Sequence, residues 1–221
     1  GRGRGGARRA GGAARLAALA LLLAAPAAAP AAEPCRLALA LALDISSSVD
    51  AREYDLQRLG LAAALRDPEI LEALLAGPGE VRLAVYEWSG WQQQDLLTGW
   101  IAIRAPADAA ALARRLEAHR RPYRDFSTAI GRALAFGASL LARPPARGCA
   151  RRVIDVSGDG VHNEDVAPAA IRASGALAGI TVNALVIAGA RPPPAPHYAA
   201  QVIHGPGAFV MVAEGGFADY T

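Results

Sequence analysis

Three segments of the sequence carry hard oxygen donors at positions where buried strands should end. The first is a D-x-S-x-S pattern that begins at Asp44, directly after the apolar run 37–43. The second contains Thr128, just before an apolar segment, and the third contains Asp159 between two glycines. Carboxylate and hydroxyl oxygens suit Mg²⁺, Mn²⁺ or Ca²⁺ better than zinc or copper. These residue types therefore predict a divalent-cation site made by Asp44, Ser46, Ser48, Thr128 and Asp159.

The hydroxyl residues also have a simpler interpretation. Serine and threonine are common as helix caps and in turns, where their oxygens accept hydrogen bonds from backbone N–H groups. Ser46, Ser48 and Thr128 would then hold no ion. D-x-S-x-S alone is a weak pattern, and the case for a metal site depends on all three segments occurring together.

The segments around these residues alternate between strand-like and helix-like patterns. The run 37–43 suits a strand that is buried on both faces. Further strands are expected at 81–88, 97–103, 151–157, 180–187 and 208–212, and helices at 49–66, 69–75, 108–119, 128–141, 168–177 and 198–203. This order predicts an α/β fold with a doubly wound, mostly parallel sheet. The strands at 81–88 and 97–103 should pair antiparallel, with 97–103 as one short edge strand.

Open α/β sheets bind ligands just beyond the carboxyl ends of their strands. The three segments in order, on this alternating pattern, resemble the metal-ion-dependent adhesion site of the von Willebrand factor A domain. The resemblance extends over about 35–220, through the segments DISSSVD, YEWSGWQQQ, STAIG, VIDVSGDGVHN, ITVNALVI and HGPGAFV. These segments look like an exported bacterial branch of such domains that is known only as a domain of unknown function.

The resemblance implies a Rossmann-like fold and a role for each candidate ligand. Ser46 and Ser48 would bind the ion directly, and Thr128 directly or through water. Asp44 and Asp159 would act through bridging waters and hydrogen bonds to the serines. The ion would keep an open position for an acidic side chain of a protein partner. Domains of this type end with a helix after the last strand, and we expect 33–221 to be such a domain without that helix.

The first 32 residues have the pattern of a secretory signal peptide. Residues 1–15 are basic, 16–25 form an apolar core, and 26–32 supply small residues in A-x-A spacing. The apolar core is too short to span a bilayer comfortably. We therefore expect 1–32 to be a signal peptide, and the mature protein to be periplasmic or extracellular without a transmembrane segment.

The charge pattern argues against a nucleic-acid partner. All 23 basic residues are arginine, and five of them lie in 1–32, where there is no acid. The rest of the chain carries 18 arginines against 20 acidic residues. The calculated pI of about 9.2 therefore reflects the N-terminal segment, not a basic binding face.

The two cysteines are placed to form a disulfide. Cys35 lies nine residues before Asp44, and Cys149 lies ten residues before Asp159. If the two strands are parallel neighbours, both sulfurs lie at the same edge of the sheet, near bridging distance. An exported protein can keep such a bond. Two free or buried thiols are the alternative.

Other polar residues lie near these segments. Asp155 lies within an apolar strand and should have a partner, such as an arginine or backbone N–H groups, because an unpaired buried charge is costly. A structural role is expected for it, and a role beside the metal is the alternative. His162 and Asn163 are interpreted as solvated loop residues. The remaining histidines, His119, His197 and His204, show no metal-ligand spacing. An arginine group is interpreted as a solvated face: Arg114, Arg115, Arg120, Arg121 and Arg124.

Two tryptophans end the second predicted strand. Trp88 and Trp91 could form part of a binding surface, or could cap the sheet. The sequence does not separate these alternatives.

An enzyme is the alternative to a binding module. Asp44 could accept a phosphoryl group, but the second acidic position of the usual D-x-D loop is Ser46, and the chain has no lysine to hold a phosphate. A serine hydrolase would need a histidine near Ser46 or Ser48, and the G-x-S-x-G pattern is absent. We therefore expect a protein-binding module that is not an enzyme, with a metal-dependent hydrolase or phosphotransfer enzyme as the alternative. A metal-free structural domain is a third option.

Overall fold

The computed structural model of the protein describes Gly1, Gly3 and residues 34–220. The predicted signal peptide at 1–32 otherwise lies outside the described residues. Within 34–220, no helix has the length and apolar character needed to cross a membrane.

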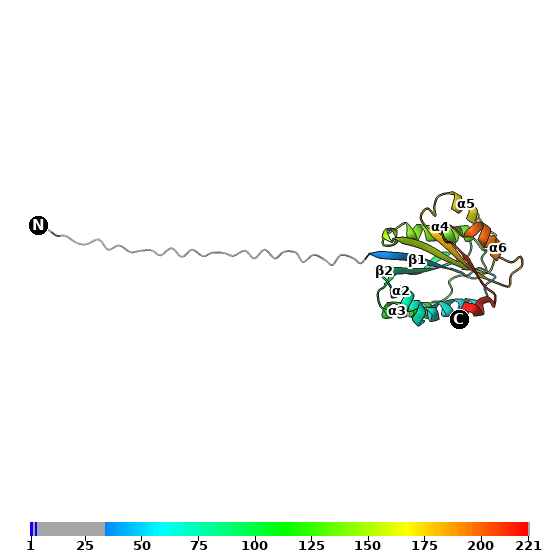
Figure 1. Ribbon diagram of the computed structural model, residues 1–221, viewed down its shortest axis with the longest axis horizontal. Helices are drawn as coiled ribbons and strands as arrows, with labels where there is room; N and C mark the ends of the chain where they lie inside the picture. The colour runs from blue at the N-terminus through cyan, green and yellow to red at the C-terminus, as the bar shows by residue number, and fades with distance from the viewer. Residues whose placement is uncertain (2, 4–33, 221) are drawn as a thin grey trace. The chain divides into compact units, whose positions relative to one another are not determined.

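Residues 34–220 fold around one mixed sheet with helices on both faces (Figure 1). The strands are β1 (Cys35–Asp44), β2 (Glu80–Trp88), β3 (Gln94–Ile103), β4 (Arg151–Gly158), β5 (Thr181–Ile187) and β6 (Val210–Ala213). Their order across the sheet is β3-β2-β1-β4-β5-β6. Strand β3 is antiparallel to β2, and the other neighbours are parallel. The predicted doubly wound α/β fold is confirmed.

Two helical layers cover the sheet. One contains α1 (Ala51–Ala64), α2 (Pro68–Leu75) and α3 (Pro106–Ala118), and the other contains α4 (Ile130–Leu141), α5 (Pro168–Ala173), α6 (Ala195–His197) and η2 (Tyr198–Val202). Figure 1 shows α4, α5 and α6 on one side of the strands and α2 and α3 on the other. Two further short turns of 3₁₀ helix are η1 (Ala146–Gly148) and η3 (Gly216–Tyr220).

Strand β1 separates the two layers through the size of its side chains. Its leucines pack toward the cluster with α1 and α3, and its alanines Ala38, Ala40 and Ala42 face the α4 cluster. The small alanine side chains let α4 pack close to the sheet. Gly137 of α4 also allows this close packing, because a Cβ there would lie 2.6 Å from the Tyr86 hydroxyl and 2.8 Å from Ile154 Cδ1.

The chain changes direction across the sheet at β1. After β1 it passes to β2 on one side, and later returns to β4 on the other side. In such folds the carboxyl ends of the two central strands flank a crevice that binds ligands. Asp44 is the last residue of β1, and Gly158 is the last residue of β4. The first and third candidate segments are thereby placed side by side.

The edge strand and one helix differ in length from the prediction. Strand β3 is antiparallel as expected but is not short, since it has ten residues and pairs with β2 as far as Gln94 opposite Trp88. The strand begins with the polar residues Gln94 and Asp95, which an apolar pattern does not identify as part of a strand. Helix α5 ends at Ala173, earlier than expected, and Gly175 follows with φ of 80°, which breaks a right-handed helix.

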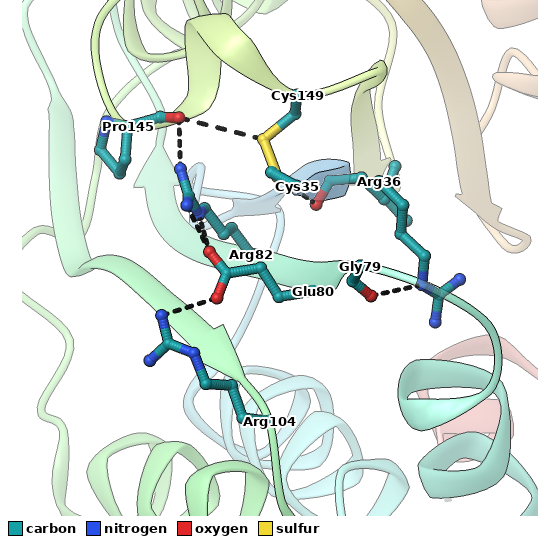
Figure 2. Close-up of a disulfide and its surroundings, with 9 residues drawn as sticks. Cys35, Arg36, Gly79, Glu80, Arg82, Arg104, Pro145 and Cys149 are labelled. Atoms are coloured by element: carbon teal, nitrogen blue, oxygen red, sulfur yellow. Dashed lines mark hydrogen bonds and ion pairs between the residues drawn. A yellow bond between two sulfur atoms is a disulfide. The ribbon is translucent and has the colours of Figure 1, made fainter. Parts of the chain in front are cut away.

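The end of the sheet opposite Asp44 is closed by a disulfide between Cys35 and Cys149 (Figure 2). The two Cα atoms lie 4.6 Å apart, although 114 residues separate them in the chain. Beside the disulfide, buried Glu80 forms ion pairs with Arg82 and Arg104. Arg82 also donates to the carbonyl of Pro145 at 2.6 Å, which ties β2 to the segment that leads to Cys149.

Candidate metal centre

The first loop turns sharply after β1 because of its own aspartate. Asp44 is fully buried, and its Oδ1 accepts the Ser46 backbone N–H at 2.8 Å. The turn brings Ser46 Oγ to 3.1 Å from Ser48 Oγ. The other carboxylate oxygen, Asp44 Oδ2, is buried and has no hydrogen-bond partner among the described residues. A buried anionic oxygen of this kind needs a cation or a donor.

The three predicted segments converge beyond the ends of β1 and β4. Ser48 Oγ donates to Asp159 Oδ1 at 2.6 Å, across 111 positions of sequence. A Cβ built on Gly160 would lie 3.6 Å from Thr128 Oγ1 and 4.0 Å from Ser48 Oγ. The side-chain oxygens of the first, second and third segments are thus neighbours in space.

A buried amide network fixes the backbone beneath Asp44. Gln57 of α1 donates to the Asp44 carbonyl at 3.0 Å, and its own side-chain oxygen accepts from Ser157 Oγ at 3.0 Å. Both residues are almost fully buried. The network joins the end of β1 to the end of β4 through α1, and no local feature of the sequence marks Gln57 for this role.

Asn163 is an exposed loop residue, as expected, and it also holds the second segment in place. Its side-chain oxygen accepts from the Thr128 backbone N–H at 2.8 Å, and its own N–H donates to the Thr128 carbonyl at 3.1 Å. A further bond of 2.9 Å runs from the Ser47 N–H to the Phe126 carbonyl and joins the first segment to the second. Asn163 lies four residues after Asp159, so it also links the second segment to the third.

Arg121 is the exception in the arginine group that was expected to be solvated. Its guanidinium donates to the carbonyls of Ile45 and Val49 at 2.7 Å and to that of Ser46 at 3.0 Å. The Ser46 carbonyl also accepts from the Val49 N–H at 3.0 Å within the turn, and one planar donor reaches all three carbonyls. The other members, Arg114, Arg115, Arg120 and Arg124, are exposed.

Burial disfavours the ionised form of both carboxylates of the site. Burial and, after it, the negative charge of Asp159 raise the pKa of Asp44 to about 7, against the hydrogen bonds from Ser46 and the charge of Arg121. Burial also raises the pKa of Asp159, and the hydrogen bond from Ser48 opposes it. A divalent cation between the carboxylates would offset both effects.

The donor set fits a hard cation. Within the described residues, no group of three His, Cys, Asp or Glu side chains is arranged to hold a metal ion. An ion at this site would depend on serine and threonine hydroxyls beside the two carboxylates, a set that favours Mg²⁺, Mn²⁺ or Ca²⁺.

The two tryptophans have separate roles. Trp88 is fully buried in the cluster beneath α4, where it belongs to the core. Trp91 lies in the turn between β2 and β3, and 49% of its surface is exposed. Trp88 therefore packs in the core at the end of the sheet, and Trp91 stays a candidate for a binding surface.

Asp155 and the histidines near the site have partners of their own. Asp155 Oδ1 accepts from the Asn183 amide at 2.8 Å, so its partner is neither the arginine nor the backbone N–H expected from the sequence. The His162 N–H donates to His197 Nε2 at 3.3 Å, and burial lowers the pKa of both imidazoles.

The fold is similar to that of solved adhesive and matrix proteins. Proximal thread matrix protein 1 from the mussel byssus matches with a TM-score of 0.63 and 14% identity, over 86% of this chain and 46% of that one. A second structure of that protein, with a zinc-occupied MIDAS motif, matches with a TM-score of 0.60 and 16% identity over 83% and 42%. The pilus adhesin SpaC from Lactobacillus rhamnosus GG matches with a TM-score of 0.59 and 11% identity over 86% and 30%.

This chain therefore spans less than half the length of each of these three structures. At such low identity the likeness shows the fold, which is that of a von Willebrand factor A-like domain. No curated protein matches the sequence. Residues 34–221 match the model of one protein family, and the chain belongs to that family, described as protein of unknown function DUF1194.

Proposed function

We propose that this protein is an exported module that binds a protein partner through a divalent cation. The observation that carries the proposal is the convergence of the three oxygen-bearing segments, seen in the bond from Ser48 to Asp159 and the approach of Thr128. The fold similarity to a matrix protein with a zinc-occupied MIDAS motif and to a pilus adhesin supports the same function.

The ion would be held by Ser46, Ser48 and Thr128 through their hydroxyls, with Asp44 and Asp159 supplying the negative charge. When bound, it would supply an electrophilic centre with an open position for an acidic side chain of the partner. Ser48 is exposed while Asp44 and Ser46 are buried, so a partner would approach from the Ser48 side. Mg²⁺ is the proposed ion, with Mn²⁺ or Ca²⁺ as alternatives.

The hydrogen bonds of the serines favour binding over hydrolysis. Among the described residues, the partners of the Ser46 and Ser48 hydroxyls are each other and Asp159. Neither hydroxyl is paired with a histidine, as the nucleophile of a serine hydrolase would be. An exported location, in the periplasm or outside the cell, follows from the N-terminal pattern and suits a disulfide-bonded domain.

Ion binding can be tested by thermal unfolding in chelator and in millimolar Mg²⁺, Mn²⁺, Ca²⁺ or Zn²⁺. An ion at about one hundred times its Kd should stabilise the domain by about 2.7 kcal/mol, which corresponds to a rise in Tm of roughly 5–10 °C. The rise should disappear in Ser48→Ala and in Thr128→Val. Ser47→Ala is the matched control, because Ser47 is an exposed serine of the same loop that is not a proposed ligand.

Partner binding can be tested with a displayed library of random peptides, selected in Mg²⁺ and eluted with chelator. The selected peptides should share an acidic residue, and replacing it by its amide should abolish binding. Ser47→Ala should bind as the parent does, and Ser48→Ala should not. The proposal is wrong if none of the four ions changes the Tm, or if peptides bind equally well in chelator.

A further inference from the structure

Two exposed aromatic residues belong to segments that border the candidate metal centre. Trp91, in the turn between β2 and β3, is 49% exposed, and Phe126, in the segment before α4, is 41% exposed. The two segments approach each other at Gly90, next to Trp91, since a Cβ at that position would be 3.4 Å from Phe126 Cβ. The ring of Tyr123 packs edge-on against Phe126 at 5.8 Å between centroids. The result is an exposed aromatic platform, defined by Trp91 and Phe126.

The backbone of this platform is bonded to the segments that carry the proposed ligands. The Ser89 carbonyl accepts from the Ala129 N–H at 2.9 Å, and Ser89 Oγ donates to the Ser127 carbonyl at 3.1 Å. These bonds connect the turn that carries Trp91 to both sequence neighbours of Thr128, Ser127 and Ala129. The Phe126 carbonyl accepts from the Ser47 N–H at 2.9 Å.

A side chain beyond the third segment also holds the platform. The Trp91 N–H donates to Glu164 Oε2 at 2.8 Å, and Glu164 follows Asn163, which brackets Thr128. The positions of Trp91 and Phe126 are therefore fixed relative to all three segments of the candidate centre.

Such an arrangement has little use in the fold itself. Single exposed apolar residues are ordinary on protein surfaces, but here two exposed aromatic residues lie on neighbouring segments whose backbones are hydrogen-bonded to the candidate centre. Aromatic anchors with few rotatable bonds supply contact area at a low entropic cost, and tryptophan is enriched among residues that dominate binding energy. The contact they offer is apolar, whereas the adjacent ion would take a carboxylate.

The charge beside the platform limits what can bind there. Glu164 contacts the Trp91 backbone, and Asp125 precedes Phe126. Both are acidic, so a second acidic residue of a partner would be repelled from this side of the site. The surface therefore fits one acidic side chain with an apolar neighbour, and disfavours an acidic run.

We propose that this platform selects the partner: the protein binds a segment in which the metal-binding acidic residue is flanked by an aromatic or large aliphatic residue that packs on Trp91 and Phe126. This inference rests on the proposed function, since it names the partner that the same centre would take.

The test uses an array of Gly-Ser peptides, each with one Asp or Glu and with Phe, Leu or Ser at a neighbouring position. In Mg²⁺, the parent protein should bind the Phe and Leu peptides about tenfold more tightly than the Ser peptides. In Trp91→Ser/Phe126→Ser this preference should fall to about onefold, because the aromatic contact is gone. The Mg²⁺-dependent rise in Tm should be unchanged in the variant, which shows that the centre is intact.

Leu59→Ser/Phe209→Ser is the matched control, because it removes two exposed apolar side chains, 43% and 48% exposed, that the proposal does not use. This control should keep the tenfold preference. If the parent protein binds all acidic peptides in an ion-dependent way but without preference for Phe or Leu, the inference about the platform is wrong and the proposed function still stands. Absence of any ion-dependent binding would overturn both. Binding to phosphatidylcholine–phosphatidylglycerol vesicles that the platform variant loses would assign the aromatics to a lipid surface and overturn the inference.

Discussion

At the scale of single residues, Gly158 shows how closely the parts of the candidate centre are packed. It ends β4, and a Cβ at this position would overlap the Tyr198 hydroxyl and lie 2.9 Å from Asp44 Oδ2. Trp88 borders the same space at 3.4 Å. The absence of a side chain at residue 158 therefore leaves room for the Asp44 carboxylate in its observed position.

Replacing Gly158 by alanine should damage both stability and ion binding. The added methyl group must displace Tyr198 or Asp44, and overpacking of this kind costs about 1–3 kcal/mol. Urea unfolding should show this loss, and the rise in Tm with Mg²⁺ should shrink because Asp44 has moved. Gly99→Ala is the control, since a Cβ at Gly99 meets nothing within 4 Å. Equal responses of the two variants to Mg²⁺ would contradict this account of Gly158.

The residues that bear the oxygens could be predicted from sequence, but those that hold them in place could not. Asp44, Ser48 and Asp159 stand out because their types and spacing form a pattern, and the structure brings them together. Asn163 and Arg121 act through contacts with backbone groups, Asn163 at Thr128 and Arg121 at the turn after β1. Nothing local distinguishes such residues from solvated ones, because their partners are set by tertiary structure.

At the scale of elements, helix α1 begins where the first ligand segment ends. Asp50 caps it in a reciprocal capping box, in which the Glu53 N–H and the Asp50 N–H each donate at 2.8 Å to the other residue's carboxylate. This box was readable from the spacing of Asp50 and Glu53 alone. It fixes the chain two residues after Ser48, so a local sequence signal contributes directly to the position of the site.

The length of β3 was harder to predict because it depends on its neighbour. Gln94 and Asp95 have no strand-like pattern, yet they continue the ladder opposite Trp88 and Glu87. Pairing with an existing strand can extend an edge strand into polar sequence. The antiparallel direction, in contrast, follows from the short connection between β2 and β3.

The pairing of β4 with β5 contains a polar cross-strand pair, Asp155 opposite Asn183. Burial raises the pKa of Asp155, and the hydrogen bond from Asn183 opposes this change. Since the folded-state pKa is above the unfolded value of 3.8, ionisation of Asp155 disfavours folding. Its contribution to stability is fully present below that value and is lost as the pH rises through the folded-state pKa.

Asp155→Asn should therefore be more stable than the parent at pH 7.5, and the difference should vanish near pH 3.5. Asparagine keeps an oxygen for the Asn183 amide but cannot ionise. Guanidinium unfolding at several pH values measures the difference, with Glu72→Gln as a control that removes an exposed carboxylate. A parent that is the more stable of the two at pH 7.5 would show that the Asp155 charge is favourable where it lies.

At the scale of the whole molecule, the sheet separates a structural end from the candidate binding end. Strand β1 runs from Cys35 to Asp44, a length of about 30 Å at roughly 3.3 Å per residue. The disulfide and the Glu80 ion pairs lie at one end (Figure 2), and the oxygen-bearing segments lie at the other. A structural change at the disulfide end can therefore affect the binding end only through the central strands.

Loss of the disulfide should lower the stability of the domain without changing its affinity for the ion. A bond that closes a loop of 114 residues restricts the unfolded chain strongly, and its removal should cost about 3–5 kcal/mol. Urea unfolding of Cys35→Ala/Cys149→Ala should show this loss, and dithiothreitol should destabilise the parent but not the variant. The concentration of Mg²⁺ at half-maximal effect should stay the same in both, because the ligand segments are bonded to one another and not to the disulfide end. A weaker response to Mg²⁺ in the variant would mean that the two ends are coupled through β1 and β4.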